Sequence, residues 1–108
     1  MAVGFLGKIT DIKIGFLENR YDDSKTFGVQ FSLKENDSQC ECCYYKYLIS
    51  YSCISLEELL FVRNLLLKYN INSVSELIGK PVMIYYEHAS RSPQCLGFSC
   101  VDENGCEI

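Results

Sequence analysis

The sequence is poor in the features that mark targeted, fibrous or multidomain proteins. Among its 108 residues there are only two prolines and one histidine, and we see neither a Gly/Ser-rich linker nor a low-complexity tract. No apolar run approaches the roughly 18 residues of a membrane-spanning helix. The N-terminal residues lack the basic segment and long apolar core of a secretory signal. We therefore expect one compact, cytoplasmic domain with no membrane span, because this length suits a single domain.

Acidic residues outnumber basic ones by 14 to 10, which gives a formal net charge of -4. This balance argues against a protein that holds duplex nucleic acid by general attraction to phosphates. The excess lies largely in loops, since residues 17–42 carry six acidic and three basic side chains. Such loops favour a partner protein with a basic surface. The alternative is an acidic surface that only keeps the protein soluble.

Alternation of apolar and polar residues predicts strands on both sides of one helical segment. The first strand changes phase between Ile9 and Ile12, so we expect a bulge or bend near Thr10-Asp11. The predicted elements are strands at 4–16, 26–33 and 43–54, a helix at 56–69, a short helix at 74–78, and strands at 82–88 and 95–101.

The helical segment begins with Ser55 and Glu58 at the spacing of a capping box. Its apolar residues sweep a broad arc and leave a narrow polar face at Glu57, Asn64 and Lys68. We therefore expect this helix to be buried against a sheet. Arg63 falls within the apolar arc, and we expect it to extend to the surface or to pair with an acid.

The order of three strands, a helix and two strands resembles the OB-fold, a five-stranded Greek-key barrel. A bent first strand suits such a barrel, because that strand must turn a corner and serve both halves. The expected fold class is α+β or mostly β. Its expected form is a five-stranded antiparallel OB-like barrel or sheet, with the main helix between strands three and four; an open sheet with one helix on its face is the alternative.

A second resemblance covers about a quarter of the chain, residues 61–87. Its segments Ile71-Asn72-Ser73-Val74 and Leu77-Ile78-Gly79-Lys80-Pro81-Val82, together with an early Gly7-Lys8-Ile9, are similar to small uncharacterised proteins of phages and prophages. The chain also resembles anti-CRISPR inhibitors in being short and acidic. These resemblances imply a phage- or mobile-element-borne protein in the host cytoplasm. It would inhibit a nucleic-acid-handling defence protein by occupying its surface.

Catalytic motifs are missing from the sequence. His88 is the only histidine, and a nucleophilic cysteine would need a nearby base. Gly4 and Gly7 precede a predicted strand, whereas a phosphate-binding loop precedes a helix. We therefore expect a protein that is not an enzyme and needs no cofactor.

Seven cysteines are many for a chain of this length. Their spacings, C-x-C-C and C-x₄-C-x₅-C, are weak matches to the C-x₂₋₄-C knuckles of structural zinc sites. A zinc-stabilised interaction module is still an alternative, with Cys40 and Cys43 joined by Cys95 or Cys100. The favoured interpretation is reduced thiols, with Cys53 and Cys100 acting as small apolar residues on strand faces.

Two surfaces are candidates for binding. Tyrosines near the start of the third strand could anchor a protein partner beside the acidic loops, although they could equally line the core. The residues predicted to bind a partner protein are Asp22, Asp23, Glu35, Asp37, Glu41, Tyr44, Tyr45 and Tyr47. The second hypothesis is an OB-like binder of single-stranded nucleic acid, in which tyrosines stack on bases. It adds the cations Arg20, Lys25, Lys46 and Arg91.

Overall fold

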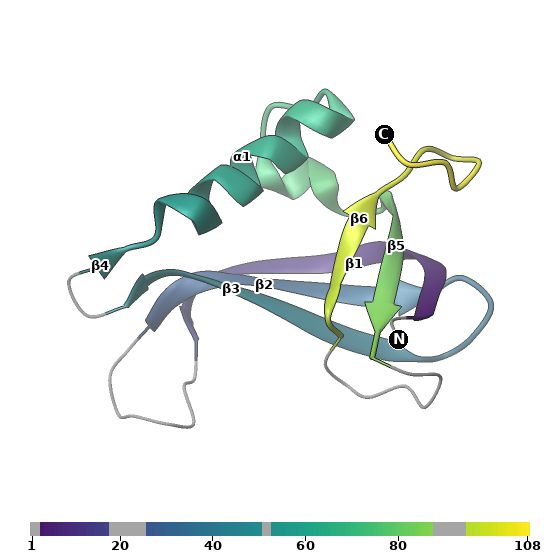
Figure 1. Ribbon diagram of the computed structural model, residues 1–108, viewed down its shortest axis with the longest axis horizontal. Helices are drawn as coiled ribbons and strands as arrows, with labels where there is room; N and C mark the ends of the chain where they lie inside the picture. The colour runs from purple at the N-terminus through teal and green to yellow at the C-terminus, as the bar shows by residue number, and fades with distance from the viewer. Residues whose placement is uncertain (1–2, 18–25, 51–52, 88–94) are drawn as a thin grey trace.

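The computed structural model describes residues 3–17, 26–50, 53–87 and 95–108 (Figure 1). Its elements are β1 (Val3–Leu17), β2 (Thr26–Glu35), β3 (Glu41–Ser50), β4 (Cys53–Ile54), α1 (Leu56–Tyr69), the 3₁₀ helix η1 (Val74–Leu77), β5 (Pro81–Tyr86) and β6 (Gly97–Cys100). The strands form one antiparallel sheet in the order β4-β3-β2-β1-β5-β6.

The sheet curls into a half-barrel. The long strands β1, β2 and β3 form one side, while β5 and β6 run across them at the other (Figure 1). Helix α1 and η1 cover the concave face. Across the described ranges, no hydrogen-bonded ladder joins β3 to β6. The mostly-β class with one helix is confirmed, whereas the expected number of five strands is wrong.

Strand β1 serves both sides of the half-barrel. Residues 3–8 pair with β5, and residues 7–17 pair with β2. The register with β2 shifts between Ile9 and Asp11, so Thr10 is the extra residue of a bulge. The Thr10 hydroxyl donates a 3.1 Å hydrogen bond to the Ser32 carbonyl. The predicted bend is thus confirmed, and it keeps both Ile9 and Ile12 on the core side.

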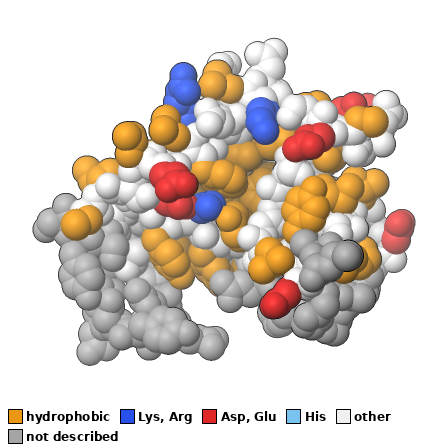
Figure 2. Space-filling model, in the orientation of Figure 1, with side chains coloured by type: hydrophobic (Ala, Val, Ile, Leu, Met, Phe, Trp, Pro, Cys, Tyr) orange, Lys and Arg blue, Asp and Glu red, His pale blue; other side chains and the backbone are white. Residues whose placement is uncertain are grey.

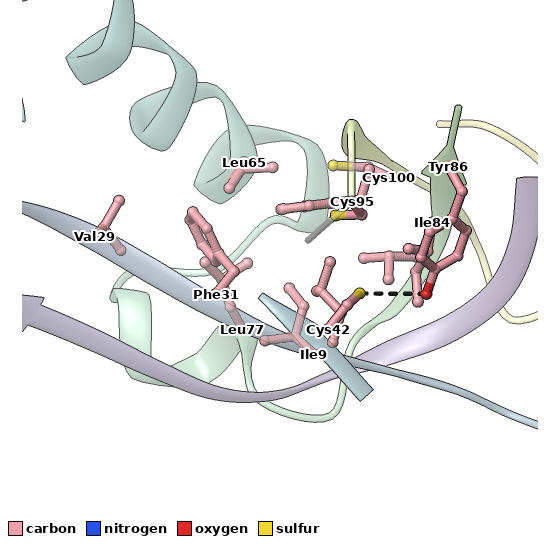
Figure 3. Packing of buried hydrophobic residues seen from close by; sticks show 13 residues of the cluster. Ile9, Val29, Phe31, Cys42, Leu65, Leu77, Ile84, Tyr86, Cys95 and Cys100 are labelled. Carbon is pink, nitrogen blue, oxygen red and sulfur yellow. Dashed lines mark hydrogen bonds between the residues drawn. The ribbon is translucent and has the colours of Figure 1, made fainter. Parts of the chain in front are cut away.

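The core lies between the concave face and the two helical segments. Figure 3 shows Leu65 of α1 packed over Val29 and Phe31 of β2, with Ile9 of β1 beneath. The aromatic rings of Phe31 and Phe98 meet edge to face with centroids 5.2 Å apart. This cluster connects the two sides of the half-barrel through side chains.

Both helical segments have side-chain caps at their N-termini. Of the predicted Ser55–Glu58 capping box, only the Ser55 hydrogen bond is present, because the Glu58 carboxylate pairs with Lys46. Ser55 Oγ accepts a 3.3 Å hydrogen bond from the Glu58 backbone N–H. In η1, the Glu76 carboxylate accepts 2.8 Å hydrogen bonds from the backbone N–H groups of Asn72 and Ser73. Helix α1 ends at Asn70, whose φ of 54° is left-handed. These caps explain why the predicted bounds of α1 are correct.

The sequence-based interpretation is wrong at three points of the fold. Residues 43–54 are not one strand, because Ile54 pairs back antiparallel with Ile49 as the separate strand β4. Cys53 is exposed, whereas Cys100 is buried as expected. Helix α1 is not buried on most of its apolar arc, since Leu65 alone is fully buried among its residues. This last difference matters most for function.

Candidate functional site

The outer face of helix α1 is apolar and uncovered. Leu56, Leu60 and Leu67 lie on this face, with Arg63 among them, and we call these four residues the α1 outer stripe. Leu56 is 68% exposed and Leu67 is 61% exposed. Just before the helix, Ile54 is 66% exposed. Figure 2 shows hydrophobic side chains along the upper edge of the molecule, over α1.

The stripe follows directly from helical geometry. At 100° per residue, its four positions fall within an arc of about 60°. Their spacing of i, i+4, i+7 and i+11 is that of a helix–helix contact seam. Phe61 and Leu65, which pack on the core, lie on a different side of the same helix. Helix α1 therefore has two apolar faces, and the half-barrel covers only one of them.

A charged contact fixes the first turns of α1 on the sheet. Lys46 Nζ of β3 lies 3.1 Å from a Glu58 carboxylate oxygen. The same ammonium lies 4.7 Å from the ring centroid of Phe61 and 5.1 Å from that of Tyr44. Partial burial alone would lower the pKa of Lys46, but Tyr44 and Glu58 outweigh it and raise that pKa. Lys46 therefore stays charged and holds α1 in one orientation over the sheet.

The convex face of the sheet carries a second candidate surface. Tyr45 and Tyr47 of β3 have nearly parallel rings, with centroids 6.5 Å apart and an interplanar angle of 6°. Tyr45 lies opposite Gln30, which in turn lies opposite Lys13 on β1. Residues directly opposite across antiparallel strands share a face. Tyr45, Gln30 and Lys13 thus form one row across three strands, and Tyr47 lies next to Tyr45 on the same face.

The charge of this convex face differs from that of the whole chain. Lys8 pairs with Lys34, and Lys34 pairs with Glu41. These residues lie on the same side of the sheet as Lys13, because Ile9 and Leu33 point into the core. On β1 to β3 the convex face holds three lysines against Asp11 and Glu41, which is slightly basic on an acidic protein.

A buried polar cluster lies where β3 approaches the segment before β6. The Tyr86 hydroxyl lies 3.4 Å from Cys42 Sγ and 3.4 Å from a Glu35 carboxylate oxygen. Cys95 belongs to the same buried cluster as Cys42 and Tyr86. Figure 3 shows Cys42, Cys95 and Tyr86 converging beside Ile84 at this end of the core. Four groups with ionisable protons therefore share one water-poor environment.

The pKa values of the Cys42 and Cys95 thiols are shifted in opposite directions. Interaction with the Cys95 thiol lowers the pKa of Cys42 to about 7, against the effect of burial and with help from Tyr86. The same interaction, together with burial, raises the pKa of Cys95. Burial and the contact with Cys42 also raise the pKa of Tyr86. Burial and the interaction between the thiols thus oppose each other at Cys42 and add together at Cys95.

The structure separates the residues predicted to bind a partner protein. Glu35 is 4% exposed and faces Tyr86 in the core, so its carboxylate is not offered to a partner in this conformation. Tyr44 packs against Phe61 and Phe98 at centroid distances of 6.2 and 5.8 Å. Asp37, Glu41 and Tyr47 are exposed. Asp22 and Asp23 lie outside the described residues.

The residues of the nucleic-acid and zinc alternatives are also dispersed. Arg20, Lys25 and Arg91 lie outside the described residues, while Lys46 is on the concave side beside Glu58. Cys43 accepts a hydrogen bond from Gln30 on the convex face, whereas Cys95 and Cys100 lie in the core. Over the ranges that the structure describes, no three His, Cys, Asp or Glu side chains gather as metal ligands. The four cysteines proposed for zinc are therefore not assembled.

Two features of the structure were not predicted from the sequence. The width of the apolar arc predicts that the outer stripe of α1 is buried, although Arg63 within it is a signal that this arc meets solvent. No local pattern links Cys42 to Cys95 or Tyr86, so the sequence does not mark it as a candidate.

Comparisons with protein families, curated proteins and solved structures gave no match. None of the helices in the described ranges combines the length and apolarity needed to cross a bilayer.

Proposed function

We propose that this chain is a small, non-enzymatic binding protein that engages a partner protein through the α1 outer stripe. The exposure of three leucines at the spacing of a helix contact seam carries this proposal. Exposed apolar patches of this kind mark protein interaction sites, and amphipathic helices are recognised through such spacings.

The stripe also restricts the chemistry of the partner. Arg63 is exposed in the middle of the three leucines, and its guanidinium donates a 3.5 Å hydrogen bond to the Asn64 side-chain oxygen. A second copy packed antiparallel about the centre of the stripe would bring two such guanidinium groups together, which is unfavourable. A partner helix with apolar residues flanking one carboxylate would complement this face.

The biological role that we propose is inhibition by occupancy. The likeness of residues 61–87 to phage-encoded proteins supports a phage- or mobile-element-borne inhibitor of a nucleic-acid-handling host defence protein, as anti-CRISPR proteins are. The exposed acids Asp37 and Glu41 are available to a basic surface of such a host protein. The OB-like order of the strands is compatible with this role and does not require it.

Binding through the stripe is tested with a triple variant, Leu56→Ser, Leu60→Ser and Leu67→Ser, and a control, Leu96→Ser, at an exposed leucine before β6. Both proteins should keep the wild-type circular dichroism spectrum, because none of these side chains is buried. We expect the wild type and the control to capture the same protein from a bacterial lysate and to protect phage from defence. The triple variant should do neither. Equal capture and protection by all three would remove the stripe from the proposal.

A second candidate function is binding of single-stranded nucleic acid at the convex face. The parallel, partly exposed rings of Tyr45 and Tyr47 beside Lys13 favour it, because stacking on aromatic rings supplies about 1–3 kcal/mol per base. Fluorescence anisotropy with a labelled oligonucleotide at low salt should then show saturable binding. Tyr47→Ala should weaken it about 5-fold or more, whereas Lys68→Gln on α1 should not. A flat titration with the wild type would exclude this function.

A further inference from the structure

The C-terminal tail leaves β6 and folds back on itself as a short hairpin (Figure 1). Val101 and Glu107 form an antiparallel bridge. Inside this bridge, the Asp102 backbone N–H donates a 2.8 Å hydrogen bond to the Cys106 carbonyl oxygen, and the Gly105 N–H donates a 3.0 Å hydrogen bond to the Asp102 carbonyl oxygen. Gly105 has a φ of 83°, in the left-handed region that favours glycine. The loop of this hairpin therefore ends on a residue that must be glycine or accept strain.

Asn104 lies in this loop directly before Gly105, and it is exposed. The side-chain amide of an asparagine is open to attack by the backbone nitrogen of the next residue, which closes a succinimide ring on Cγ. A side chain on that next residue hinders the attack, and glycine has none. This is the only Asn-Gly pair in the sequence. Asn64, by contrast, lies within α1, where the helix holds the backbone nitrogen that follows it. Ring closure therefore meets the least steric hindrance at Asn104.

The folded loop opposes this reaction, and Asp102 holds the loop together. Its carboxylate oxygen Oδ1 accepts 2.9 Å hydrogen bonds from the backbone N–H groups of Asn104 and Cys106. The Gly105 nitrogen, which would make the attack, donates its hydrogen bond to the Asp102 carbonyl oxygen. While these bonds hold, this nitrogen keeps its proton and the backbone around Asn104 is fixed. Ring closure therefore requires the loop to open locally, and Asp102 sets how often it opens.

We propose that Asn104 is a site of spontaneous deamidation, and that the hydrogen bonds of Asp102 set its rate. In the open loop, the Gly105 nitrogen gives its proton to hydroxide and attacks Asn104 Cγ. The new N–Cγ bond closes the succinimide ring, while the Cγ–Nδ2 bond breaks and ammonia leaves with a proton from water. Water then opens the ring at either carbonyl carbon, which gives aspartate or isoaspartate at position 104. In total one water enters and one ammonia leaves, and no group is oxidised or reduced.

The product would weaken the attachment of the tail to the sheet. Isoaspartate lengthens the main chain by one atom, which the hairpin cannot absorb while it keeps all of its hydrogen bonds. A Cβ atom built on Gly105 would lie 3.1 Å from Leu6 Cδ1, so the loop packs closely against β1. Beyond the loop, the Ile108 N–H donates a 3.1 Å hydrogen bond to the Cys100 carbonyl oxygen at the end of β6. Modification of Asn104 should therefore loosen both contacts and add one negative charge to the tail.

The site is tested by keeping the full chain, with its cysteines reduced, at pH 8 and 37 °C and taking samples over several days. Each sample is digested with trypsin, and mass spectrometry is applied to the peptide 92–108, in which Asn104 is the only asparagine. We expect aspartate and isoaspartate to accumulate at position 104 while Asn64 is unchanged, and hydrogen exchange at the Ile108 amide to become faster. Isoaspartate identifies the succinimide route, because direct hydrolysis of the amide gives aspartate alone. Modification that occurs first at another asparagine, or a position 104 that acquires no isoaspartate, would overturn the proposal.

Two variants with the same change of charge test the role of Asp102. Asp102→Ala removes the carboxylate that accepts the hydrogen bonds of the loop, and should raise the rate of deamidation about 10-fold. Glu103→Ala removes an exposed acid directly before Asn104, and should leave the rate close to that of the wild type. Both variants should keep the wild-type circular dichroism spectrum, because neither side chain belongs to the core cluster. Equal rates in all three proteins would contradict the control by Asp102, whereas the peptide map of the wild type decides the site itself without either variant.

Discussion

Lys46 on β3 and Glu58 on α1 form the ion pair that fixes the direction of the helix over the sheet, with 3.1 Å between the charged atoms. The Lys46 ammonium also lies over the ring of Phe61, which comes from the next turn of the same helix. One side chain of the sheet thus holds two turns of α1 and sets which leucines face outwards.

Replacing Lys46 with Met should therefore destabilise the protein by about 1 kcal/mol, because the ion pair and the cation–π contact are both lost while packing volume is kept. A double-mutant cycle with Glu58→Gln, followed by urea denaturation, should give a coupling energy of about 0.5 kcal/mol. Lys13→Met, at an exposed lysine on the convex face, is the control. A coupling energy of zero would show that the pair does not hold the helix.

The capping carboxylate of Glu76 predicts a loss of stability in acid. Hydrogen bonds from the backbone N–H groups of Asn72 and Ser73 lower the pKa of Glu76 below its ordinary value of 4.5. A carboxylate with a lowered folded-state pKa stabilises the fold above its unfolded pKa, and this contribution is lost as pH falls through the folded pKa.

Melting curves recorded from pH 6 to pH 3 should therefore fall less steeply for Glu76→Gln than for the wild type. At pH 6 the variant should be the less stable of the two, and the difference should shrink towards pH 3. Glu103→Gln, in the exposed tail, should follow the wild-type curve. Parallel curves for the wild type and Glu76→Gln would contradict the capping role.

Gly7 is required by the close approach of β1 and β2. A Cβ atom at this position would lie 2.3 Å from the Lys34 carbonyl oxygen and 2.6 Å from Ile84 Cδ1. Backbone atoms cannot yield as a flexible side chain can, so Gly7→Ala should cost about 1–3 kcal/mol or more. Lys8→Ala, at the exposed neighbouring position, should cost much less. Equal free energies of unfolding for the two variants would show that the strands can separate without cost.

The bulge at Thr10 predicts a small loss of stability for a substitution and a severe loss for a deletion. Thr10→Ala loses only the hydrogen bond to the Ser32 carbonyl, and should cost about 1 kcal/mol. Deletion of Thr10 removes the extra residue of the bulge, so that either Ile9 or Ile12 must point away from the core. The deletion variant should fail to give a cooperative thermal transition. A folded deletion variant with near-native stability would show that the bulge does not set the register.

Much of the fold could be predicted from local patterns in the sequence. Period-2 alternation locates the strands, the cap at Ser55 locates the start of the main helix, and the change of phase after Ile9 locates the bulge. Each of these signals lies within a few residues of the feature that it predicts. The break between β3 and β4 was missed, because the apolar and aromatic run from 43 to 54 continues across it.

The candidate sites were harder to predict, since they depend on which surfaces meet. The helical period gives the width of the apolar arc of α1, but a single curled sheet covers only the part around Leu65. The approach of Cys42 to Cys95 and Tyr86 follows from the curl of the sheet, to which no short motif corresponds. Loop charges likewise could not show that Glu35 ends its strand facing inwards.

The division of β1 between two partners has a consequence for synthesis on the ribosome. Strands β1, β2 and β3 emerge before β5 and can pair as a meander. Val3 of β1 can pair with Tyr86 only after β5 has been synthesised. Until then the concave face has no β5 or β6 against it, and its apolar side chains are open to other chains or to chaperones. We expect arrested nascent chains that end before residue 81 to be cut readily by protease, and resistance to arise only after residue 100 has left the exit tunnel.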